Sequence, residues 1–202
     1  MCWLRKDWPG LVDKQMKHYE EEYLGKDFTH NPQLQGTYEL CNFIGCNLSG
    51  GQLSNVKFIE CHFKDCDLSN AVLGGTGLQE VTFTRCKLVG ADLSQISTFL
   101  LSIAFSECRL ELVSFAGLQL AKTDFGSSVL VEADFSAADL READLSGCNL
   151  ERASFGRSDL RKADLRNATN LDIDPEQTRL AGAKIDIHNL PGLLRKHRLR
   201  VS

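Results

Sequence analysis

The chain has no proline through most of its length and no long apolar run. All four prolines fall outside Cys41–Asn170, at Pro9, Pro32, Pro175 and Pro191. A long segment without proline suits a fold in which backbone N–H groups donate hydrogen bonds between neighbouring strands. No apolar run reaches the ~18 residues of a transmembrane helix, and residues 1–10 do not resemble a secretory signal. We therefore expect a cytoplasmic protein that does not contact a membrane.

The motifs of common enzyme classes are also missing. The five histidines are scattered, and the sequence has no phosphate-binding glycine loop and no His-Glu-x-x-His zinc motif. The paired glycines Gly50-Gly51 and Gly74-Gly75 belong to the turns of the five-residue repeat described below and do not form a nucleotide-binding loop. These absences predict a protein that is not an enzyme and that needs no cofactor.

A strict period of five residues is what the sequence has instead. Every fifth residue from Phe43 to Leu93 and from Phe105 to Leu165 is Phe or Leu, which makes 24 centres without an exception. Neither a helix nor a flat strand has this period. A second position, two residues before each centre, is small everywhere except at Ile103 and Leu118. One large and one small inward residue in each unit predict a narrow tube with a dry interior.

The repeated motif A-[D/N]-[L/F]-x-x, as in Ala138–Glu142 and Ala163–Asn167, resembles the pentapeptide-repeat proteins. The resemblance covers residues 38–187 and implies an all-β fold, a right-handed quadrilateral β-helix with about 20 residues per coil. Solenoid coils stack on their neighbours and need capped ends. We expect residues 1–37 to form an N-terminal cap with a short helix, and residues 188–202 to form a C-terminal capping and dimerisation segment.

Stacking predicts that residues one coil apart lie above one another, about 4.8 Å apart. The period slips between Leu93 and Phe105, where the spacing is twelve residues instead of ten. If two residues bulge outward near 94–101, the same residue types stay in register on both sides of the slip. This predicts one continuous core ladder, formed by Phe43, Phe63, Phe83, Phe105 and Phe125. It also predicts a candidate contact surface in the bulge, at Gln95, Ile96, Ser97, Thr98 and Phe99.

Residues 7–25 have the features of a short amphipathic helix. Asp7 lies near the expected N-cap, Pro9 falls in the first turn, and Gly25 follows the end. The apolar face of this helix would consist of Leu11, Val12, Met16, Tyr19 and Tyr23. We expect the helix to cap the open end of the tube, with partner binding as the alternative.

Seven of the eight cysteines occupy the small inward position, and only Cys2 does not. We expect these seven to be buried thiols that act as small apolar residues. Zinc is the alternative, because Cys41 and Cys46 are five residues apart, as are Cys61 and Cys66. A five-residue step places such partners on adjacent walls, which does not suit tetrahedral ligation. We therefore expect no metal site and a reducing compartment.

Charge is unevenly distributed along the chain. Residues 41–175 carry 12 basic and 18 acidic groups, a net charge of −6, whereas residues 176–202 carry six basic and two acidic groups, a net charge of +4. An aspartate just before a centre is expected to accept hydrogen bonds from backbone N–H groups at the corner. The alternative is an acidic stripe that a partner recognises, at Asp124, Asp134, Asp139, Asp144, Asp159 and Asp164. The basic cluster Arg152–Arg166 has no predicted role.

The C-terminal segment, from Asn170 through the turn at Asp174-Pro175-Glu176, resembles the tail of the Qnr, MfpA and microcin-immunity branch of this family. In that branch the tail builds a two-fold dimer, so the resemblance implies a homodimer with one patch facing its own copy. The candidate dimer seam consists of Leu190, Leu193, Leu194, Leu199 and Val201. The alternative is that these residues fold back and close the last coil.

The same resemblance implies a function. Proteins of this branch are acidic rods that mimic DNA, occupy the DNA-binding saddle of DNA gyrase, a type II topoisomerase, and protect it from quinolones or peptide toxins. It implies gyrase as the partner and no direct contact with nucleic acid. The alternative is a general protein–protein interaction scaffold unrelated to topoisomerases, because most pentapeptide-repeat proteins have no assigned role.

Overall fold

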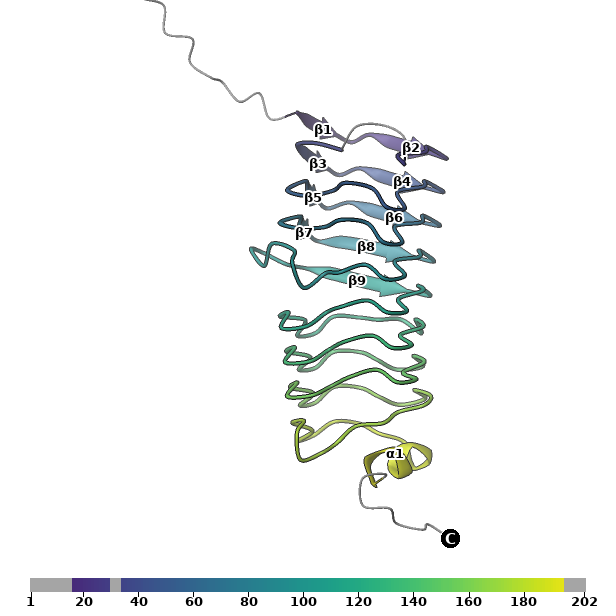
Figure 1. The fold of residues 1–202 in the computed structure, drawn as a ribbon, viewed down its shortest axis with the longest axis vertical. Coiled ribbons are helices and arrows are strands. Elements are labelled where there is room, and N and C mark those ends of the chain that lie inside the picture. The colour runs from purple at the N-terminus through teal and green to yellow at the C-terminus, as the bar shows by residue number, and fades with distance from the viewer. Residues whose placement is uncertain (1–15, 30–33, 195–202) are drawn as a thin grey trace, which may run out of the picture.

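The protein is a rod of stacked square coils, seen in the computed structural model in Figure 1. The structure describes residues 16–29 and 34–194. The fold is the right-handed quadrilateral β-helix that the sequence predicts, and its paired strands all run parallel. Registers such as Phe43↔Phe63 and Phe63↔Phe83 advance by 20 residues, which confirms the predicted coil length.

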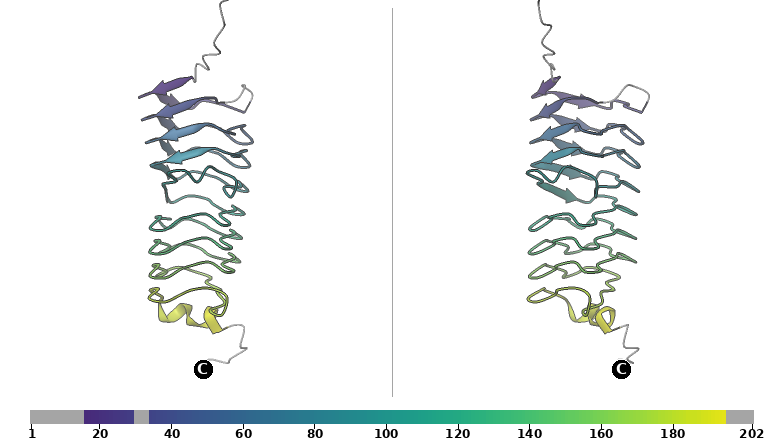
Figure 2. Two further views of the ribbon diagram at one scale, coloured as in Figure 1. Left: turned by 90° about the vertical axis from the view of Figure 1, so that its left-hand side faces the viewer. Right: turned by 60° about the vertical axis from the view of Figure 1, so that its left-hand side comes forward.

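Two parallel sheets form two neighbouring walls in the upper part of the rod (Figure 2). One sheet has the order β1-β3-β5-β7, with bounds Lys17–Tyr19, Thr37–Glu39, Lys57–Ile59 and Gly77–Gln79. The other has the order β2-β4-β6-β8-β9, with bounds Glu22–Leu24, Asn42–Ile44, His62–Lys64, Val81–Thr84 and Ile103–Ser106. Isolated parallel bridges, such as Asp124↔Asp144, continue the stacking in the lower coils.

We name the four walls by the large residues that point inward from them. Wall A carries Phe43, Phe63, Phe83, Phe105, Phe125, Leu145 and Leu165, and wall B carries Leu48, Leu68, Leu88, Leu110, Leu130 and Leu150. Wall C carries Leu53, Leu73, Leu93, Phe115, Phe135 and Phe155, and wall D carries Phe58, Leu78, Leu120, Leu140 and Leu160. All 24 predicted centres are buried. The five-residue period therefore specifies the whole core.

The core ladder on wall A continues through the slip in the period. The rings of Phe43 and Phe63 stack with centroids 4.6 Å apart, and those of Phe83 and Phe105 stack at 5.3 Å. The register Phe83↔Phe105 advances by 22 residues, so two extra residues lie in this coil. The continuous ladder Phe43, Phe63, Phe83, Phe105 and Phe125 is confirmed.

The extra residues form a loop that leaves wall D after Ser97 and returns at Ser102, visible beside β7 and β9 in Figure 1. Ser97 still pairs with Gly77, and the Ser102 N–H donates to the carbonyl of Leu78 at 3.0 Å. Phe99 and Leu100 project outward and are 70% and 64% exposed. We call residues 98–101 the wall D loop.

Ile96 does not belong to the outward contact surface that the sequence predicts. It is 5% exposed and occupies the small inward position one coil after Thr76. The physical reason is that the bulge begins only after Ser97. Ile96 therefore still follows the five-residue period, which turns its side chain inward. Of the other predicted contact residues, Gln95, Thr98 and Phe99 are exposed, and Ser97 is half-buried.

The predicted helix at 7–25 is wrong over its described part. Lys17–Tyr19 and Glu22–Leu24 are strands β1 and β2, which pair with β3 and β4. Tyr23 stacks on Phe43 with centroids 4.7 Å apart. Strand pairing satisfies the open edges of β3 and β4, which a helix would leave without partners. The remaining residues of the predicted helix, Asp7, Pro9, Leu11 and Val12, lie outside the described residues.

The lower end of the rod is closed by the short 3₁₀ helix η1, Ile187–Asn189, and by α1, Leu190–Leu194. Leu193 packs against the core. A Cβ atom on Gly192 would collide with the carbonyl oxygen of Leu171, so only glycine lets α1 lie this close to the last coil. The described part of the chain contains no helix that is long and apolar enough to cross a membrane.

The seven inward cysteines are buried free thiols, as predicted. The Sγ atoms of Cys61, Cys66 and Cys108 each donate to a backbone carbonyl of the preceding coil, at 3.3, 3.3 and 3.2 Å. Burial raises the pKa of Cys61 to about 11 and that of Cys148 to about 12. These two thiols therefore stay protonated and unreactive at neutral pH. Among residues 16–29 and 34–194, no three His, Cys, Asp or Glu side chains cluster in a way that could hold a metal ion.

Candidate functional site

The six aspartates predicted as a stripe lie on three different walls. Asp124, Asp144 and Asp164 occupy neighbouring rungs of wall A, and Asp139 and Asp159 occupy neighbouring rungs of wall D. Asp134 lies on wall C, in register with Ser114 and Ser154. The structure therefore brings together a row of three and a row of two, and it does not bring all six onto one face.

Each of these aspartates has a structural role at its corner. The Oδ1 atoms of Asp124, Asp134 and Asp144 accept the backbone N–H two residues ahead, at 2.8, 2.9 and 2.8 Å. Asp139, Asp159 and Asp164 accept the equivalent N–H at 3.2 Å. The corner role predicted for the repeat aspartates is confirmed. This role leaves the second carboxylate oxygen of each residue available for other contacts.

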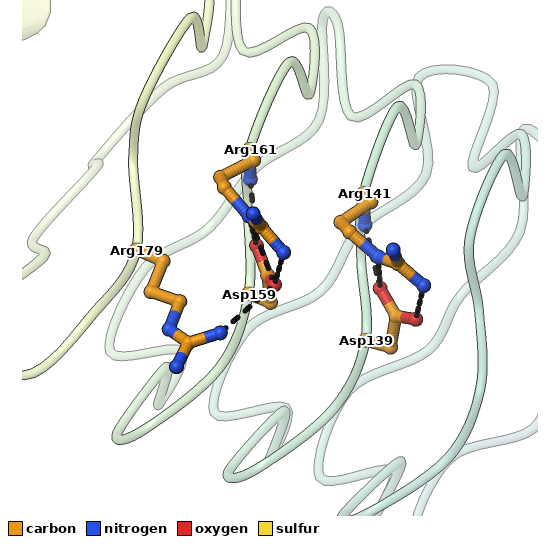
Figure 3. A network of polar contacts seen from close by, with 5 residues as sticks. All are labelled: Asp139, Arg141, Asp159, Arg161 and Arg179. Atoms are coloured by element: carbon orange, nitrogen blue, oxygen red, sulfur yellow. Dashed lines mark hydrogen bonds and ion pairs between the residues drawn. The ribbon is translucent and has the colours of Figure 1, made fainter.

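Three of the aspartates use that capacity to hold an arginine on the same wall. In Asp139-Leu140-Arg141 the leucine points inward, so the residues on either side of it both point outward. The Arg141 Nε donates to Asp139 Oδ1 at 2.8 Å, and its Nη2 donates to Oδ2 at 2.6 Å (Figure 3). Arg161 binds Asp159 in the same way: its Nε donates to Oδ1 at 2.9 Å and its Nη2 donates to Oδ2 at 2.7 Å. These are charge-assisted bidentate pairs.

Asp164 has the same partner type on wall A, with Arg166 at 2.9 and 2.6 Å. The hydrogen bonds from the three arginines lower the pKa of Asp139, Asp159 and Asp164 below the ordinary aspartate range. A second cation from the next coil approaches two of them: Arg179 Nη1 lies 3.7 Å from Asp159, and Lys184 Nζ lies 3.3 Å from Asp164. The negative charge of the lower coils is therefore largely compensated.

Asp124, Asp134 and Asp144 differ from these three, because within the described residues no cation forms an ion pair with them. Asp124 and Asp144 are exposed on wall A, and Asp134 is half-buried on wall C. Their negative charge is consequently open to solvent. The predicted stripe thus divides into three carboxylates without an ion-pair partner in the middle of the rod, of which Asp144 still attracts the Arg166 guanidinium, and three ion-paired ones near its lower end.

A groove of about 400 Å³ runs over wall D and its corner with wall C. Its polar lining consists of Gln119, Asp139, Arg141, Arg157, Ser158, Asp159, Gln177 and Arg179. A second groove of about 470 Å³ lies on the wall C side, against Arg152, Asp172 and Asp174, and the two share Gln177. Both are open surface features, and the first spans four successive rungs of wall D, at Gln119, Asp139, Asp159 and Arg179. We call the first one the wall D groove.

The predicted dimer seam divides between the core and the surface. Leu190 is 44% exposed at the lower end of the rod, whereas Leu193 and Leu194 are half-buried. Ile187, which the sequence reading omitted, is 74% exposed beside them. Leu199 and Val201 lie outside the described residues.

Sequence reading missed the arginine pairs, although a signal was present. Asp-Leu-Arg occurs three times, at 139–141, 159–161 and 164–166, and each copy flanks an inward centre. The same geometry in reverse order occurs at 109–111, where Arg109 pairs with Glu111 at 2.9 Å. Opposite charges two residues apart around a centre therefore predict an ion pair on one wall.

Comparison with known families matches two regions of the chain. Residues 37–100 match the family model described as a pentapeptide repeat region, and residues 128–167 match the model described as pentapeptide repeats in eight copies. No curated protein matches the chain.

The structure is similar to two trypsin-treated forms of QnrB1, described as a plasmid-mediated fluoroquinolone resistance protein. One has a TM-score of 0.72 and 21% identity, and the match covers 93% of this chain and 92% of that chain. The other has a TM-score of 0.61 and 22% identity, and covers 93% and 100%. HetL, a pentapeptide-repeat protein of the cyanobacterium Nostoc involved in heterocyst differentiation regulation, is 23% identical with a TM-score of 0.37, over 84% and 83% of the two chains. The similarity to QnrB1, at such low identity, shows a shared fold.

Proposed function

The chain belongs to the pentapeptide-repeat family, and on that premise we propose that it is a non-enzymatic binding protein that mimics duplex DNA and occupies the DNA-binding surface of a type II topoisomerase, DNA gyrase. QnrB1, whose fold it shares, is described as a fluoroquinolone resistance protein. Protection of a drug target by occupation of its DNA site would give such resistance.

The observation that carries this proposal is a pair of exposed carboxylates on wall A that form no ion pair within the described residues. Asp124 and Asp144 lie on consecutive rungs, and both are held in fixed orientation by their bonds to the corner backbone. Parallel strands repeat about every 4.8 Å, so the two charges follow the rod axis at that spacing. A pre-oriented row of negative charge on a rigid surface favours fast and selective association with a basic saddle.

The length of the rod supports the same reading. Eight coil-to-coil steps lead from Tyr23 to Ile185 on wall A. At about 4.8 Å a step they span roughly 38 Å, and a dimer joined at its lower ends would be about twice as long. A straight body of that length suits a surface that normally holds a DNA duplex. The exposed Phe99 of the wall D loop, with Gln95 and Thr98, would add a contact beside the saddle.

The direct test measures gyrase supercoiling in the presence of a quinolone. The purified protein is expected to restore supercoiling, and the variant Asp124→Asn/Asp144→Asn is expected to do so with at least about tenfold lower potency. Asparagine keeps the Oδ1 atom that accepts the corner N–H, so the turn is preserved while the charge is removed. Absence of any relief by the wild-type protein, even in large molar excess, would rule the proposal out.

The matched control removes two acidic charges elsewhere. Glu60 and Glu80 lie at the corner between walls D and A in the upper coils and form no ion pair in the described part of the chain. The variant Glu60→Gln/Glu80→Gln is expected to keep wild-type potency. Equal loss in both variants would show that only net charge matters, and it would contradict a role for wall A.

A general interaction scaffold is the second candidate, favoured by the three compensated aspartates. Because Arg141, Arg161 and Arg166 cancel Asp139, Asp159 and Asp164, the lower coils present alternating charge instead of a continuous negative field. Mixed patches suit recognition of a protein surface other than a DNA site. Affinity capture that recovers one partner other than a topoisomerase, together with no effect on gyrase, would favour this function.

A further inference from the structure

The wall D groove carries net positive charge on a rod whose net charge is negative. Its lining contributes the guanidinium groups of Arg141, Arg157 and Arg179 and the carboxylates of Asp139 and Asp159. Arg161, which holds Asp159, adds a fourth cation at the same surface (Figure 3). Four cations against two anions leave a net charge of about +2. Residues 41–194, which include all six of these groups, carry 14 basic and 20 acidic groups, a net charge of −6, so this local excess is opposite in sign to the charge of the rod.

Two of the four arginines have hydrogen-bonding capacity to spare. Asp139 and Asp159 are each engaged by two bonds from Arg141 and Arg161. Arg179 reaches Asp159 only at 3.7 Å and its side chain is 73% exposed. Arg157 forms no ion pair with any residue of 16–29 or 34–194. The groove therefore offers the donors of Arg157 and Arg179 to a ligand.

The backbone fixes how these two arginines are placed. The Arg157 N–H donates to the carbonyl of Gln177 at 2.9 Å, and the Arg179 N–H donates to the carbonyl of Ser158 at 3.1 Å. Consecutive coils thus hold Arg157 at the corner of walls C and D and Arg179 on wall D itself. Two guanidinium forks on a rigid frame match carboxylate groups, which accept paired N–H donors in one plane.

We propose that the wall D groove binds an acidic peptide segment of a partner protein, with Arg157 and Arg179 pairing to its Asp or Glu side chains. The carboxylates of Asp139 and Asp159 form part of the groove and would repel the double charge of a phosphate group more strongly than a single carboxylate. Gln119 and Gln177 add neutral donors and acceptors for the peptide backbone. Binding of such a peptide does not require that the protein also bind a topoisomerase.

The test uses the full chain and a fluorescein-labelled hexaglutamate peptide, with a hexaglutamine peptide of the same length as the neutral probe. Fluorescence anisotropy is expected to show binding of hexaglutamate only. The variant Arg157→Glu/Arg179→Glu is expected to weaken binding at least about tenfold, because two charge-assisted contacts become repulsive. The control Lys57→Glu/Lys64→Glu reverses two charges in the upper coils and is expected to change affinity less than about twofold.

Circular dichroism melting of both variants shows whether the rod is intact, and a single Arg157→Gln variant keeps the test valid if charge reversal disturbs folding. Failure of the wild-type protein to bind hexaglutamate would overturn the proposal. Equal weakening in the control variant would overturn it too, because binding would then be nonspecific. Displacement of the peptide by inorganic phosphate or a 12-base-pair duplex at lower concentration than by unlabelled hexaglutamate would assign the groove to phosphate instead. The assay contains no topoisomerase, so its outcome is separate from that of the supercoiling test.

Discussion

At the scale of single residues, position relative to an inward centre decides what a side chain does. The residue before a centre and the residue after it share one wall, so their charges meet, as in Asp139 with Arg141 and Asp164 with Arg166. The sequence predicts all 24 buried centres correctly because they depend only on the period, whereas Ile96, expected in the outward bulge, is buried. It does not show which charges cancel until the coil geometry places them side by side.

Acid titration tests these ion pairs. Asp139, Asp159 and Asp164 have a pKa that is lower in the folded protein than in the unfolded chain, because an arginine hydrogen-bonds each carboxylate. Such groups stabilise the fold fully above the unfolded aspartate pKa of about 3.9, and the contribution is lost as the pH falls toward the folded pKa. We therefore expect the urea concentration at the unfolding midpoint of the wild-type protein to decrease as the pH is lowered below about 4.

The variant Asp139→Asn/Asp159→Asn/Asp164→Asn is the comparison for this titration. It keeps the corner acceptors and removes the three titrating charges. Its urea midpoint is expected to be lower than that of the wild type at pH 7 and to approach the wild-type value near pH 2.5. A difference between the two proteins that stays constant from pH 7 to 2.5 would show that these pairs contribute no pH-dependent stability.

At the scale of the element, the structural unit that repeats along the chain is the corner between two walls, not a strand. The corner of Phe135-Ser136-Ala137-Ala138 is closed by a bond from the Ala138 N–H to the Phe135 carbonyl at 3.0 Å. Its third residue, Ala137, has a φ of 58°, a left-handed conformation that costs a residue with a Cβ about 1 kcal/mol. Glycine occupies the same corner position at Gly117, with a φ of 72°. Polar and glycine-rich corners could be predicted from the sequence, but the left-handed residue within each corner could not be assigned.

Ala137→Gly is expected to stabilise the protein by up to about 1 kcal/mol, because the gain in backbone fit exceeds the entropic cost of glycine. Ala121→Gly is the matched control: Ala121 is also exposed, but its φ is not positive. That substitution is expected to destabilise by about 0.5–1 kcal/mol. Urea denaturation of the two variants measures both changes, and a loss of stability in both would contradict the argument.

At the scale of the whole molecule, the two ends were harder to predict than the middle. Tyr23 and Phe28 lie 20 residues before Phe43 and Leu48, so the first coil also follows the five-residue period. The pattern is hard to recognise because Tyr and His replace Leu and Phe there, and because the position two before Tyr23, which is small and buried in later coils, is the exposed Glu21. Within the described residues the first coil meets another coil on one side only, and a partly polar face is tolerated there.

The lower end leads to a prediction about assembly. Ile187 and Leu190 are exposed where the rod ends, and we expect them to form the contact between two copies related by a two-fold axis. Ile187→Asp is expected to shift the protein from dimer to monomer in sedimentation velocity. Leu112→Asp is the control, because Leu112 is 56% exposed at a corner far from either end. A monomeric wild-type protein at micromolar concentration, or a dimer unaffected by Ile187→Asp, would contradict this seam.

The wall D loop has a consequence for how any partner aligns with the rod. A solenoid surface nearly repeats itself with each coil, so a bound partner displaced by one rung meets similar chemistry and loses little affinity. The loop, with Phe99 and Leu100 at its tip, occurs in only one of the described coils and breaks this translational symmetry. The loop therefore gives a partner one fixed reference position along the rod axis. A partner that engages the loop can then locate Asp124, Asp144 and Arg157 at fixed axial offsets, and sliding by a rung becomes costly.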